Sequence, residues 1–204
     1  MRPTFEHEDT LPGPVAGVDE VGRGPWAGPV VAAAVVLDRS CVPDGLRDSK
    51  ALSPARREAL ASAIRRSAAF GIGISSVEEI DAGGVGRATL AAMTRALDAL
   101  PAPPGSVLID GVVLPVLPTG LRALALPRAD ARCASVAAAS IVAKVHRDAI
   151  MTELGRAHPA YAWARNKGYG TKEHAAALDA HGVTPHHRRS FAPIARRIAA
   201  AADR

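Results

Sequence analysis

The stretch "AGVDEVGRGPWAGPVV", residues 16–31, connects two apolar runs through a glycine-rich turn. The runs on either side, residues 15–21 and 30–37, are dominated by Val and Ala. Continuous runs of this kind are typical of strands that are buried on both faces of a sheet. The stretch therefore predicts the first two strands of a sheet, with Asp19 and Glu20 at the end of the first strand.

The rest of the chain supplies further strands and the helices that cover them. Ser53 followed by proline forms an N-cap and first-turn pair, and Ser76 before two glutamates starts another helix. Further strands are predicted at residues 70–77, 106–110 and 121–127, and further helices at residues 90–100 and 136–158. Strands come in succession first and later alternate with helices, so the expected fold class is α/β, with a mixed sheet flanked by helices.

The domain organisation follows from changes in composition along the chain. Residues 1–14 are rich in proline and charge and are expected to form a flexible N-terminal arm. Residues 15–156 carry the predicted sheet and its helices. Residues 157–204 hold both tyrosines and a dense set of Lys, Arg and His, which indicates a small basic helical lobe at the C-terminus.

Composition restricts the class of protein and its surroundings. The formal charge of +5 favours a polyanionic partner such as nucleic acid, but it also suits a basic surface without one. Cys41 and Cys133 have no disulfide or zinc spacing, so we expect free thiols in a reducing compartment. The N-terminus lacks a signal-peptide pattern, and the apolar runs fall short of the roughly 20 residues of a membrane span. We therefore expect a cytoplasmic protein with no membrane association.

Four acids stand at or just after the ends of apolar runs: Asp19, Glu20, Asp110 and Asp130. Active sites of α/β sheets collect at such strand ends. Carboxylates that converge there repel one another unless cations lie between them, and Mg²⁺ or Mn²⁺ with oxygen ligands is the natural cation. Each acid also has a structural interpretation, since Asp110 with Gly111 is a turn signal and Asp130 is able to cap the following helix.

The adjacent pair Asp19 and Glu20 raises a geometric question. Neighbouring residues of a strand point to opposite faces, so both acids serve one metal centre only if the strand ends or twists there. The glycines after Val21 permit such a break.

The glycine turn itself resembles a dinucleotide-binding loop only superficially. Its third glycine, Gly28, comes one position late, and a strand rather than a helix follows. A better interpretation is that Gly22 and Gly24 let the backbone approach a sugar-phosphate chain, while Arg23 supplies a positive charge for phosphate. The alternative is a tight turn with an exposed arginine.

The C-terminal segment contains two further candidate contacts. Tyr169, in "KGYG", offers an aromatic face flanked by small residues and a cation, which suits a sugar or base, although a packed loop tyrosine is the alternative. The run "HHRR", residues 186–189, lacks the spacing of a zinc site, and we interpret it as a solvated, phosphate-facing patch.

The motifs "GVDEVGRGPWAGPVV", "DSKALS", "VLIDG", "AASIVAKVHRD", "KGYGT" and "HHRRSF", in this order, resemble those of the bacterial ribonuclease HII family of type 2 ribonucleases H. The resemblance spans roughly residues 15–195. It implies a ribonuclease H-like mixed sheet of five strands with a C-terminal helical part. It also implies metal-dependent cleavage of the RNA strand of RNA–DNA hybrids, and incision 5′ of single ribonucleotides in duplex DNA, leaving 3′-hydroxyl and 5′-phosphate ends.

The resemblance also assigns roles to individual residues. It makes the four acids metal ligands, with Asp19 and Asp110 bridging two divalent ions. It makes the turn of residues 22–24 the sensor of the ribose 2′-hydroxyl, and Tyr169 the platform for the adjoining deoxyribose. Asp130 stands in "RADAR", where bacterial relatives usually carry Gly-Asp-Ser.

Three residues of the remaining motifs are assigned more loosely. Lys50 and Lys144 are expected to contact phosphate, although either of them could be structural. The helix position of Asp148 favours a structural hydrogen bond or salt bridge over metal ligation.

Two alternative functions share some of these features. A DNA-cutting nuclease on the same fold would use the same acids but gives no reason for the glycine turn and Tyr169. A non-catalytic hybrid-binding module would bind the same nucleic acids without cutting them. For the enzyme, the expected partners are RNA–DNA hybrid and ribonucleotide-containing duplex DNA, and the expected state is a monomer.

Overall fold

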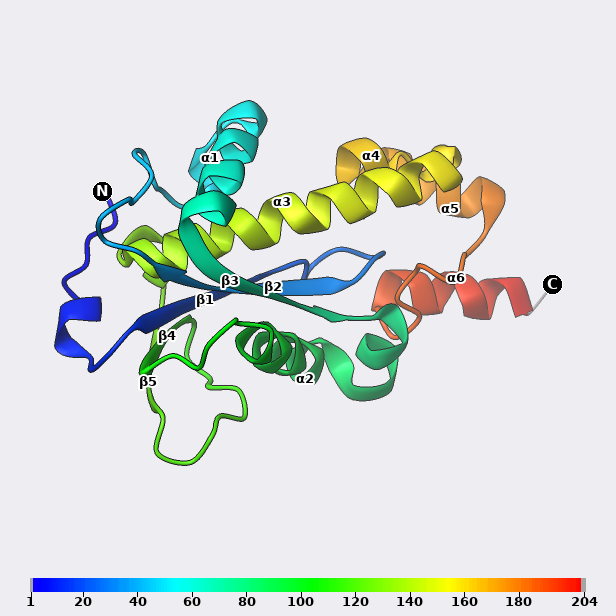
Figure 1. Ribbon diagram of the computed structural model, residues 1–204. Helices are drawn as coiled ribbons and strands as arrows, with labels where there is room; N and C mark the ends of the chain where they lie inside the picture. Colours follow the sequence, from blue (N-terminus) through cyan, green and yellow to red (C-terminus); the bar gives the residue numbers. More distant parts are fainter. Residues whose placement is uncertain (1, 203–204) are drawn as a thin grey trace.

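The computed structural model describes residues 2–202 and is built around one mixed sheet (Figure 1). The five strands lie in the order β3-β2-β1-β4-β5. Their bounds are Val15–Val21 for β1, Val30–Leu37 for β2, Ala68–Ser75 for β3, Ser106–Asp110 for β4 and Arg122–Leu126 for β5. β2 is antiparallel to both β1 and β3, whereas β1, β4 and β5 run parallel. The predicted α/β class and mixed sheet are confirmed.

The first two strands form the hairpin that the opening stretch predicts. Pairing continues to the last residue of β1, where Val21 lies opposite Val31. Gly22 then adopts φ +96° and Gly28 adopts φ +83°, a region that side-chain-bearing residues rarely occupy. The strand therefore runs unbroken through both acids, and the turn begins only after them.

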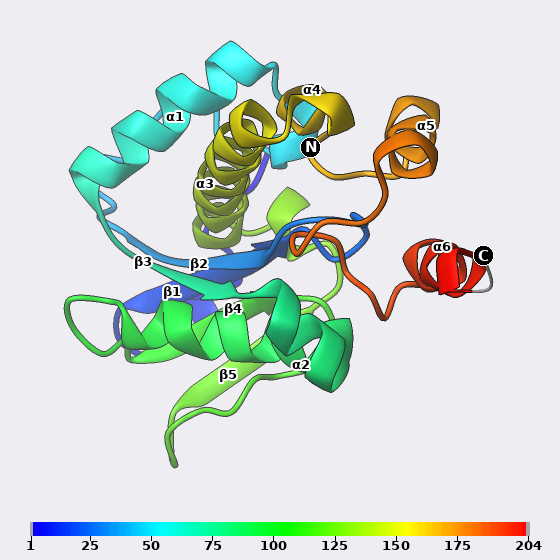
Figure 2. The same ribbon diagram turned by 90° about the vertical axis from the view of Figure 1, so that its right-hand side faces the viewer.

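Three helices cover the two faces of the sheet (Figures 1 and 2). α2 (Val77–Asp98) packs on one face, and α1 (Pro54–Ser67) and α3 (Ala134–Ala157) pack on the other. The side chain of Ser53 caps α1, and that of Ser76 forms a capping box on α2, as their positions predict. α2 is kinked at Gly84, which divides it near the boundary between the two predicted helices.

The central strand lies unusually close to α3. A β-carbon placed on Gly17 would come 2.2 Å from the backbone carbon of Ser135, so only glycine permits this separation of strand and helix. The alanine-rich face of α3 is buried over most of its length. Small side chains on both elements thus bring the helix against the end of β1 that carries Asp19.

Of the C-terminal helices, α4 packs beside the far end of α3, α5 follows it, and α6 lies apart from α3 (Figures 1 and 2). Their bounds are Trp163–Asn166 for α4, Lys172–His181 for α5 and Ala192–Ala202 for α6. Their apolar core also includes Ala27 of the glycine-rich turn and Met151 of α3. The lobe therefore shares its core with the elements that carry the turn.

Short 3-10 helices complete the chain. They are η1 (Glu8–Thr10), η2 (Ser49–Ala51), η3 (Ala129–Ala131) and η4 (Pro159–Tyr161). η1 lies in the segment that the sequence predicts to be a flexible arm. Within it Glu8 is buried and accepts hydrogen bonds from the backbone N–H (3.0 Å) and the hydroxyl (2.8 Å) of Ser135, at the start of α3. This carboxylate lies at the positive end of the α3 dipole.

The two cysteines are free thiols, as predicted. Cys41 is exposed, whereas Cys133 is buried and its burial raises the pKa of its thiol to about 12.

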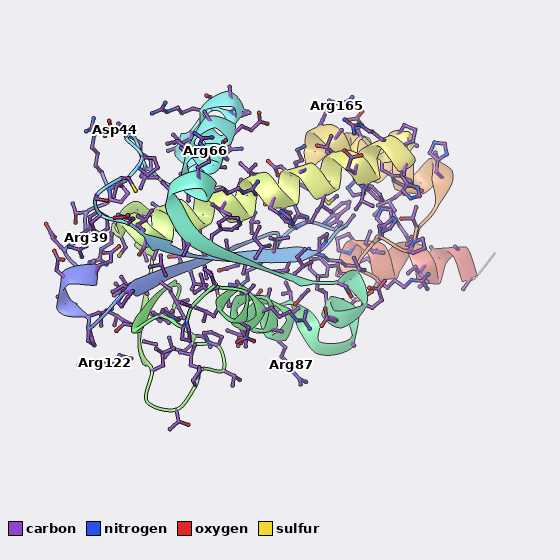
Figure 3. The ribbon with its side chains drawn as sticks, viewed as in Figure 1. Arg39, Asp44, Arg66, Arg87, Arg122 and Arg165 are labelled. Atoms are coloured by element: carbon purple, nitrogen blue, oxygen red, sulfur yellow. The ribbon has the colours of Figure 1, made fainter. Side chains whose placement is uncertain are left out.

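Among the described residues, no helix is both long and apolar enough to cross a membrane. The exposed arginines labelled in Figure 3 project from different sides of the molecule. Positive charge is thus not confined to one side of the fold.

Candidate metal centre and nucleic-acid interface

Three carboxylates meet at the ends of the parallel strands. In the β1–β4 ladder Val18 lies opposite Ile109, so the next residues, Asp19 and Asp110, stand side by side on the same face. Asp130 lies in η3, directly after the end of β5. One oxygen of each carboxylate lies within 4.8 Å of an oxygen of the other two. The structure thus brings together three of the four predicted acids, which we call the acid cluster.

Backbone hydrogen bonds hold two members of the acid cluster in place. The N–H of Ala129 donates to Asp110 Oδ1 at 2.7 Å, and the N–H of Glu20 donates to Asp19 Oδ1 at 2.7 Å. Burial, followed by the charges of Glu20, Asp110 and Asp130, raises the pKa of Asp19 well above its ordinary value. Burial and the neighbouring acids also raise the pKa of Asp130. The cluster therefore carries mutual repulsion that a cation would relieve.

The residues of the acid cluster fit a divalent metal ion. Their oxygen donors are the ligands that Mg²⁺ and Mn²⁺ prefer, and the spacing of the three carboxylates allows a single ion to contact all of them. Two of the side chains are buried, so water alone compensates their charge poorly.

Glu20 lies on the other face of the sheet. β1 keeps its alternation, so Asp19 faces α3 while Glu20 lines a pocket with Thr89 and Met93 of α2. Its Oε1 accepts a hydrogen bond from Arg23 Nη1 at 3.3 Å, and its Oε2 is buried with no partner among the described residues. The pocket also includes Asp110, so Glu20 reaches the border of the acid cluster without joining it. The strand break that the glycines permit does not occur.

Lys50 stands next to the acid cluster. It lies exposed on η2, whose N-cap is Asp48. Burial opposes its protonation, but the charges of Asp48, Asp130, Asp19 and Asp110 together raise its pKa. Its ammonium group therefore stays charged beside the site where a phosphate would meet the carboxylates.

Lys144 and Asp148 form an ion pair on α3. Lys144 Nζ lies 2.6 Å from Asp148 Oδ1, and Arg57 Nη1 lies 3.7 Å from Asp148 Oδ2. The structural role predicted for Asp148 is confirmed. Because Lys144 is bound to this carboxylate, its charge is partly neutralised before any phosphate approaches.

The two outer glycines of the turn have different surroundings. Gly22 is buried against Arg147, and a β-carbon there would come 2.2 Å from Arg147 Nε. Gly24 is exposed, and a β-carbon there would have the Cε1 of Tyr169 as its neighbour at 3.7 Å. Arg23 and Tyr169 are exposed as well. Arg23, Gly24 and Tyr169 thus form one continuous surface, which we call the reading face.

The prediction of a solvated patch at residues 186–189 is wrong for its two central residues. His187 and Arg188 are fully buried, and only Arg189 is exposed. Arg188 donates to the carbonyl oxygens of Gly22, Arg23, Gly28 and Pro29, at distances from 2.5 to 3.2 Å. The charged run therefore supports the turn from inside.

Sequence reasoning also missed Arg147, which is buried and bound to three backbone carbonyl groups. The sequence contains one signal for its burial. Arg147 lies at four-residue spacing between Ala143 and Met151, both of which are buried on the same face of α3. Charge alone suggests an exposed residue, and the carbonyl groups that it binds come from segments distant in sequence.

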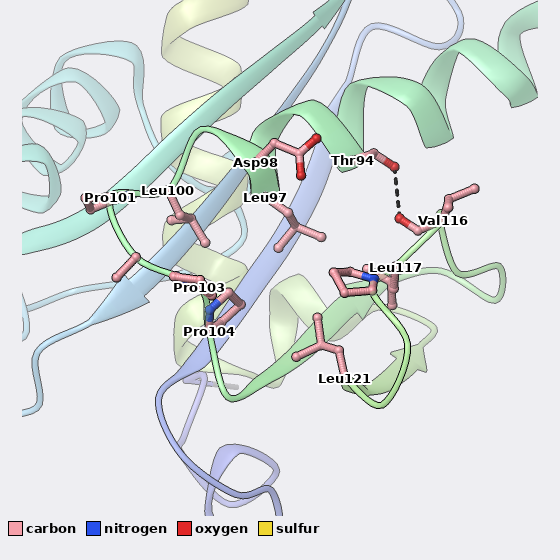
Figure 4. Close-up of a pocket in the computed structure, with 12 residues that line it drawn as sticks. Thr94, Leu97, Asp98, Leu100, Pro101, Pro103, Pro104, Val116, Leu117 and Leu121 are labelled. Atoms are coloured by element: carbon pink, nitrogen blue, oxygen red, sulfur yellow. Dashed lines mark hydrogen bonds between the residues drawn. The ribbon is translucent and has the colours of Figure 1, made fainter.

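An apolar pocket lies elsewhere in the molecule (Figure 4). It is formed by the end of α2, the residues after it and the loop before β5, where Thr94 donates to the carbonyl of Val116 at 3.2 Å. None of its lining residues belongs to the acid cluster or the reading face. The chemistry of the protein is therefore concentrated at the strand ends.

The sequence profile of the Ribonuclease HII family matches residues 16–194. The ribonuclease HII of Jannaschia sp. (strain CCS1) is 59% identical over 198 residues, which cover 96% of this chain and 98% of the relative. The ribonuclease HII of Wolbachia pipientis subsp. Culex pipiens is 51% identical over 193 residues, covering 94% and 97% of the two chains.

Solved structures of ribonucleases H share the fold. The ribonuclease H2 of Pyrococcus horikoshii OT3 superposes with a TM-score of 0.79 at 26% identity, covering 93% of this chain and 99% of that chain. Bst-RNase HIII, solved in complex with Mn²⁺, superposes with a TM-score of 0.71 at 23% identity, covering 97% and 73%. With three carboxylates gathered as a divalent-metal-dependent ribonuclease H requires, and a family match over nearly the whole chain, this protein belongs to the Ribonuclease HII family of endonucleases.

Proposed function

We propose that this ribonuclease H incises duplex DNA on the 5′ side of a single embedded ribonucleotide and also cleaves the RNA strand of RNA–DNA hybrids, leaving 3′-hydroxyl and 5′-phosphate ends. The observation that carries this proposal is the position of the reading face. Glu20 binds Arg23 on one side of it and adjoins the acid cluster on the other. A sugar held on the reading face would therefore present its neighbouring phosphate to the carboxylates.

The reading face suits recognition of a ribose. Only an RNA nucleotide offers a 2′-hydroxyl that hydrogen-bonds to a backbone N–H. The N–H groups of Arg23 and Gly24 have no hydrogen-bond acceptor within residues 2–202, and Gly24 has no side chain to keep a sugar away. Tyr169, 45% exposed beside Gly24, offers an aromatic surface to the adjoining deoxyribose. This pairing supports selection of the junction between one ribonucleotide and the DNA that follows.

Asp19, Asp110 and Asp130 would hold the metal, and we propose Glu20 as a further ligand because its unpartnered Oε2 borders the same site. Bound Mg²⁺ or Mn²⁺ would polarise the scissile phosphate, favour ionisation of a water molecule and stabilise the departing oxygen. The protein orients the carboxylates through the N–H groups of Ala129 and Glu20. Lys50 would attract and orient the phosphate beside them.

The remaining assignments follow from this substrate. We propose that residues 15–156 form the catalytic domain, that the C-terminal lobe from residue 157 contacts nucleic acid, and that the arm of residues 1–14 takes no direct part in cleavage. A single reading face and a single acid cluster are consistent with a monomer. Chromosomal DNA as substrate would place the enzyme in the cytoplasm.

Asp110→Asn tests the metal-site assignment. We expect the variant to lose cleavage of a hybrid in Mg²⁺ or Mn²⁺ while its affinity for the hybrid stays within about threefold of wild type, because the amide is a poor metal ligand but preserves shape. Asp98→Asn, a change to an exposed acid at the end of α2, is the matched control and should cut normally. Cleavage by the Asp110 variant at the wild-type rate would contradict the assignment. Binding without cleavage by the wild-type protein would instead indicate a non-catalytic module.

A further inference from the structure

The segment of residues 184–188 lies directly behind the reading face. It is joined to the glycine-rich turn by a bridge between His187 and Ala27, in which the N–H of Arg188 donates to the carbonyl of Trp26 at 2.8 Å. The side chains of His187 and Arg188 are both fully buried. A buried histidine next to a buried arginine is costly unless each finds specific partners. Both residues have such partners. Those of Arg188 lie in the glycine-rich turn, and those of His187 lead to Tyr169, so the two residues reach both parts of the reading face.

Arg188 fixes the orientation of two peptide groups in the turn. Its Nη1 donates to the carbonyl of Arg23 at 2.9 Å, and its Nη2 donates to the carbonyl of Gly22 at 2.5 Å. In a trans peptide the N–H points opposite to the C=O. With both carbonyls directed inward at the guanidinium, the N–H groups of Arg23 and Gly24 are directed away from it. These are the groups that we propose to read the ribose.

The guanidinium of Arg188 has no carboxylate partner among the described residues, and its compensation comes from backbone carbonyl dipoles. Burial lowers the pKa of Arg188 to about 9, which still leaves it charged at neutral pH. The planar fork of arginine binds several carbonyls at fixed angles, whereas a lysine ammonium cannot span them. The site therefore requires the shape of the guanidinium as well as its charge.

A chain of hydrogen bonds leads from His187 to Tyr169. The indole N–H of Trp163 only donates, so His174 Nε2, 3.1 Å away, accepts. The proton of His174 is then on Nδ1 and is donated to the carbonyl of Tyr169 at 3.0 Å. His187 Nε2 donates to the same Nε2 of His174 at 3.0 Å, while its Nδ1 accepts from the N–H of Thr184 at 3.0 Å. Trp163 and the N–H of Thr184 thus fix the tautomers of the two histidines, and the indole and His187 share the single lone pair of His174 Nε2.

Arg147 connects the glycine-rich turn with the segment that carries Tyr169. Its Nη1 donates to the carbonyl of Lys167 at 3.0 Å, and its Nε donates to the carbonyl of Pro29 at 2.9 Å. The N–H of Trp26 donates to the carbonyl of Gly168 at 2.8 Å. The carbonyls of residues 167, 168 and 169 are thus all held from the interior, which leaves the phenol of Tyr169 facing outward.

We propose that Arg188 and His174 are positioning residues for substrate specificity: Arg188 orients the N–H groups of the glycine turn, and His174, supported by His187, orients Tyr169. The inference rests on the proposed function, because it assigns to these buried groups the geometry by which the reading face distinguishes ribose from deoxyribose. Neither residue touches the substrate.

The first experiment separates orientation from charge at Arg188. In the Asp110→Asn background, dissociation constants are measured for a duplex with one ribonucleotide and for its all-DNA twin, and their ratio is the discrimination factor. Arg188→Met and Arg188→Lys should each lower this factor about tenfold, the equivalent of one lost hydrogen bond. Arg189→Met removes the same charge from the exposed neighbour and should keep the factor, even where both affinities fall together. A wild-type factor in Arg188→Lys would overturn the assignment.

The second experiment replaces His174 by Asn or by Gln, and each of these amide side chains keeps one hydrogen-bonding position of the imidazole. Asn places a donor near the position of Nδ1 and so retains the bond to the Tyr169 carbonyl, whereas Gln places an acceptor near Nε2 and loses that bond. The readout is the cleavage rate on a single-ribonucleotide duplex divided by that on an all-RNA hybrid strand. His174→Gln should lower this ratio about tenfold, the same loss that we expect of Tyr169→Ala, and His174→Asn should keep it within about threefold.

Thermal melts accompany both experiments because each variant disturbs a buried network. Equal ratios in the two His174 variants, whatever their stability, would mean that His174 only packs, and would overturn its positioning role. If both Arg188 variants fail to fold, the His174 pair still decides the part of the proposal that concerns Tyr169, since its members leave Arg188 intact. Failure of the proposed function is distinguishable, because the wild-type protein itself would then show no preference for the ribonucleotide duplex.

Discussion

Gly22 lies against the side chain of Arg147, with no room for a β-carbon between them. The position of such a carbon is 2.2 Å from Arg147 Nε and 2.7 Å from Arg147 Cδ, and three carbonyl groups prevent the arginine from moving. The outward part of the same turn, at Gly24, is open to solvent. One turn thus contains a glycine required by the protein interior and a glycine available to substrate.

We predict that Gly22→Ala lowers the free energy of unfolding by at least about 2 kcal/mol, since the left-handed backbone and the overlap with Arg147 both oppose a side chain. Chemical denaturation measures this loss. Gly24→Ala is the matched control and should unfold within about 0.5 kcal/mol of wild type while losing discrimination between ribose and deoxyribose. Equal stability losses in the two variants would contradict the division of roles between these glycines.

Repulsion within the acid cluster is predicted to destabilise the metal-free fold, and a bound metal ion is predicted to relieve it. Burial and three neighbouring acids raise the pKa of Asp19, so Asp19→Asn should stabilise the metal-free protein and raise its Tm. Added Mg²⁺ or Mn²⁺ should raise the Tm of wild type but hardly that of the variant. Asp98→Asn should leave both values unchanged. A metal-free Tm lower in Asp19→Asn than in wild type would contradict this account of the cluster.

The predicted pH dependence comes from His187. Burial and the neighbouring His174 lower the pKa of His187 to about 3, so between this value and its ordinary value of 6.5 the unfolded chain binds more protons than the folded one. Stability is therefore complete above pH 6.5 and is lost as pH falls below it, by up to about 1.4 kcal/mol per pH unit. The pKa values of His146, His174 and His186 are lowered too and act in the same direction.

Denaturation between pH 7.5 and 5 measures this slope. Asp19, Glu20 and Asp130 have raised pKa values and act in the opposite direction as pH falls, so the test compares the slope of the wild type with that of a His187 variant. His187→Gln should flatten the slope, whereas the change of the exposed His181 to Gln should not. Equal slopes in the wild type and in His187→Gln would contradict the buried neutral state of His187.

Lys50 and Lys144 are predicted to differ in their roles. Lys50 is exposed and faces the acid cluster, so Lys50→Met should leave the Tm unchanged and should reduce the slope of log Kd against log salt by about 1. Lys144 is bound to Asp148, so Lys144→Met should lower the Tm by a few degrees with a smaller change in salt slope. Equal salt slopes in the two variants would contradict the assignment of Lys50 as the phosphate contact.

The sequence predicts much of the fold because its strands are continuous apolar runs and its helices begin at recognisable caps. The runs before Asp19 and Asp110 mark two parallel strands whose ends meet, so these two acids could be placed together before any coordinates. The position of Glu20 could not, since whether a strand breaks depends on pairing, and Val21 pairs with Val31 in the next strand.

Burial of charged residues is the part that the sequence does not reveal. Arg147 and Arg188 bind carbonyl groups from segments far away in the chain, and only the folded structure brings those segments together. A run such as "HHRR" is more often a solvated surface, and nothing in its own residues shows that loop 26–28 will cover it. The burial of these charged residues therefore depends on long-range contacts, which local composition does not reveal.

The central claim is that the acid cluster cuts beside a sugar that the reading face has identified as ribose. The most direct test is the cleavage, with and without chelator, of a duplex that holds one ribonucleotide and of its all-DNA twin, with the product ends mapped. We predict one metal-dependent cut, 5′ of the ribonucleotide, leaving a 3′-hydroxyl and a 5′-phosphate, and an intact twin. Cleavage of the twin at a comparable rate, or of neither duplex in the presence of metal, would contradict the account.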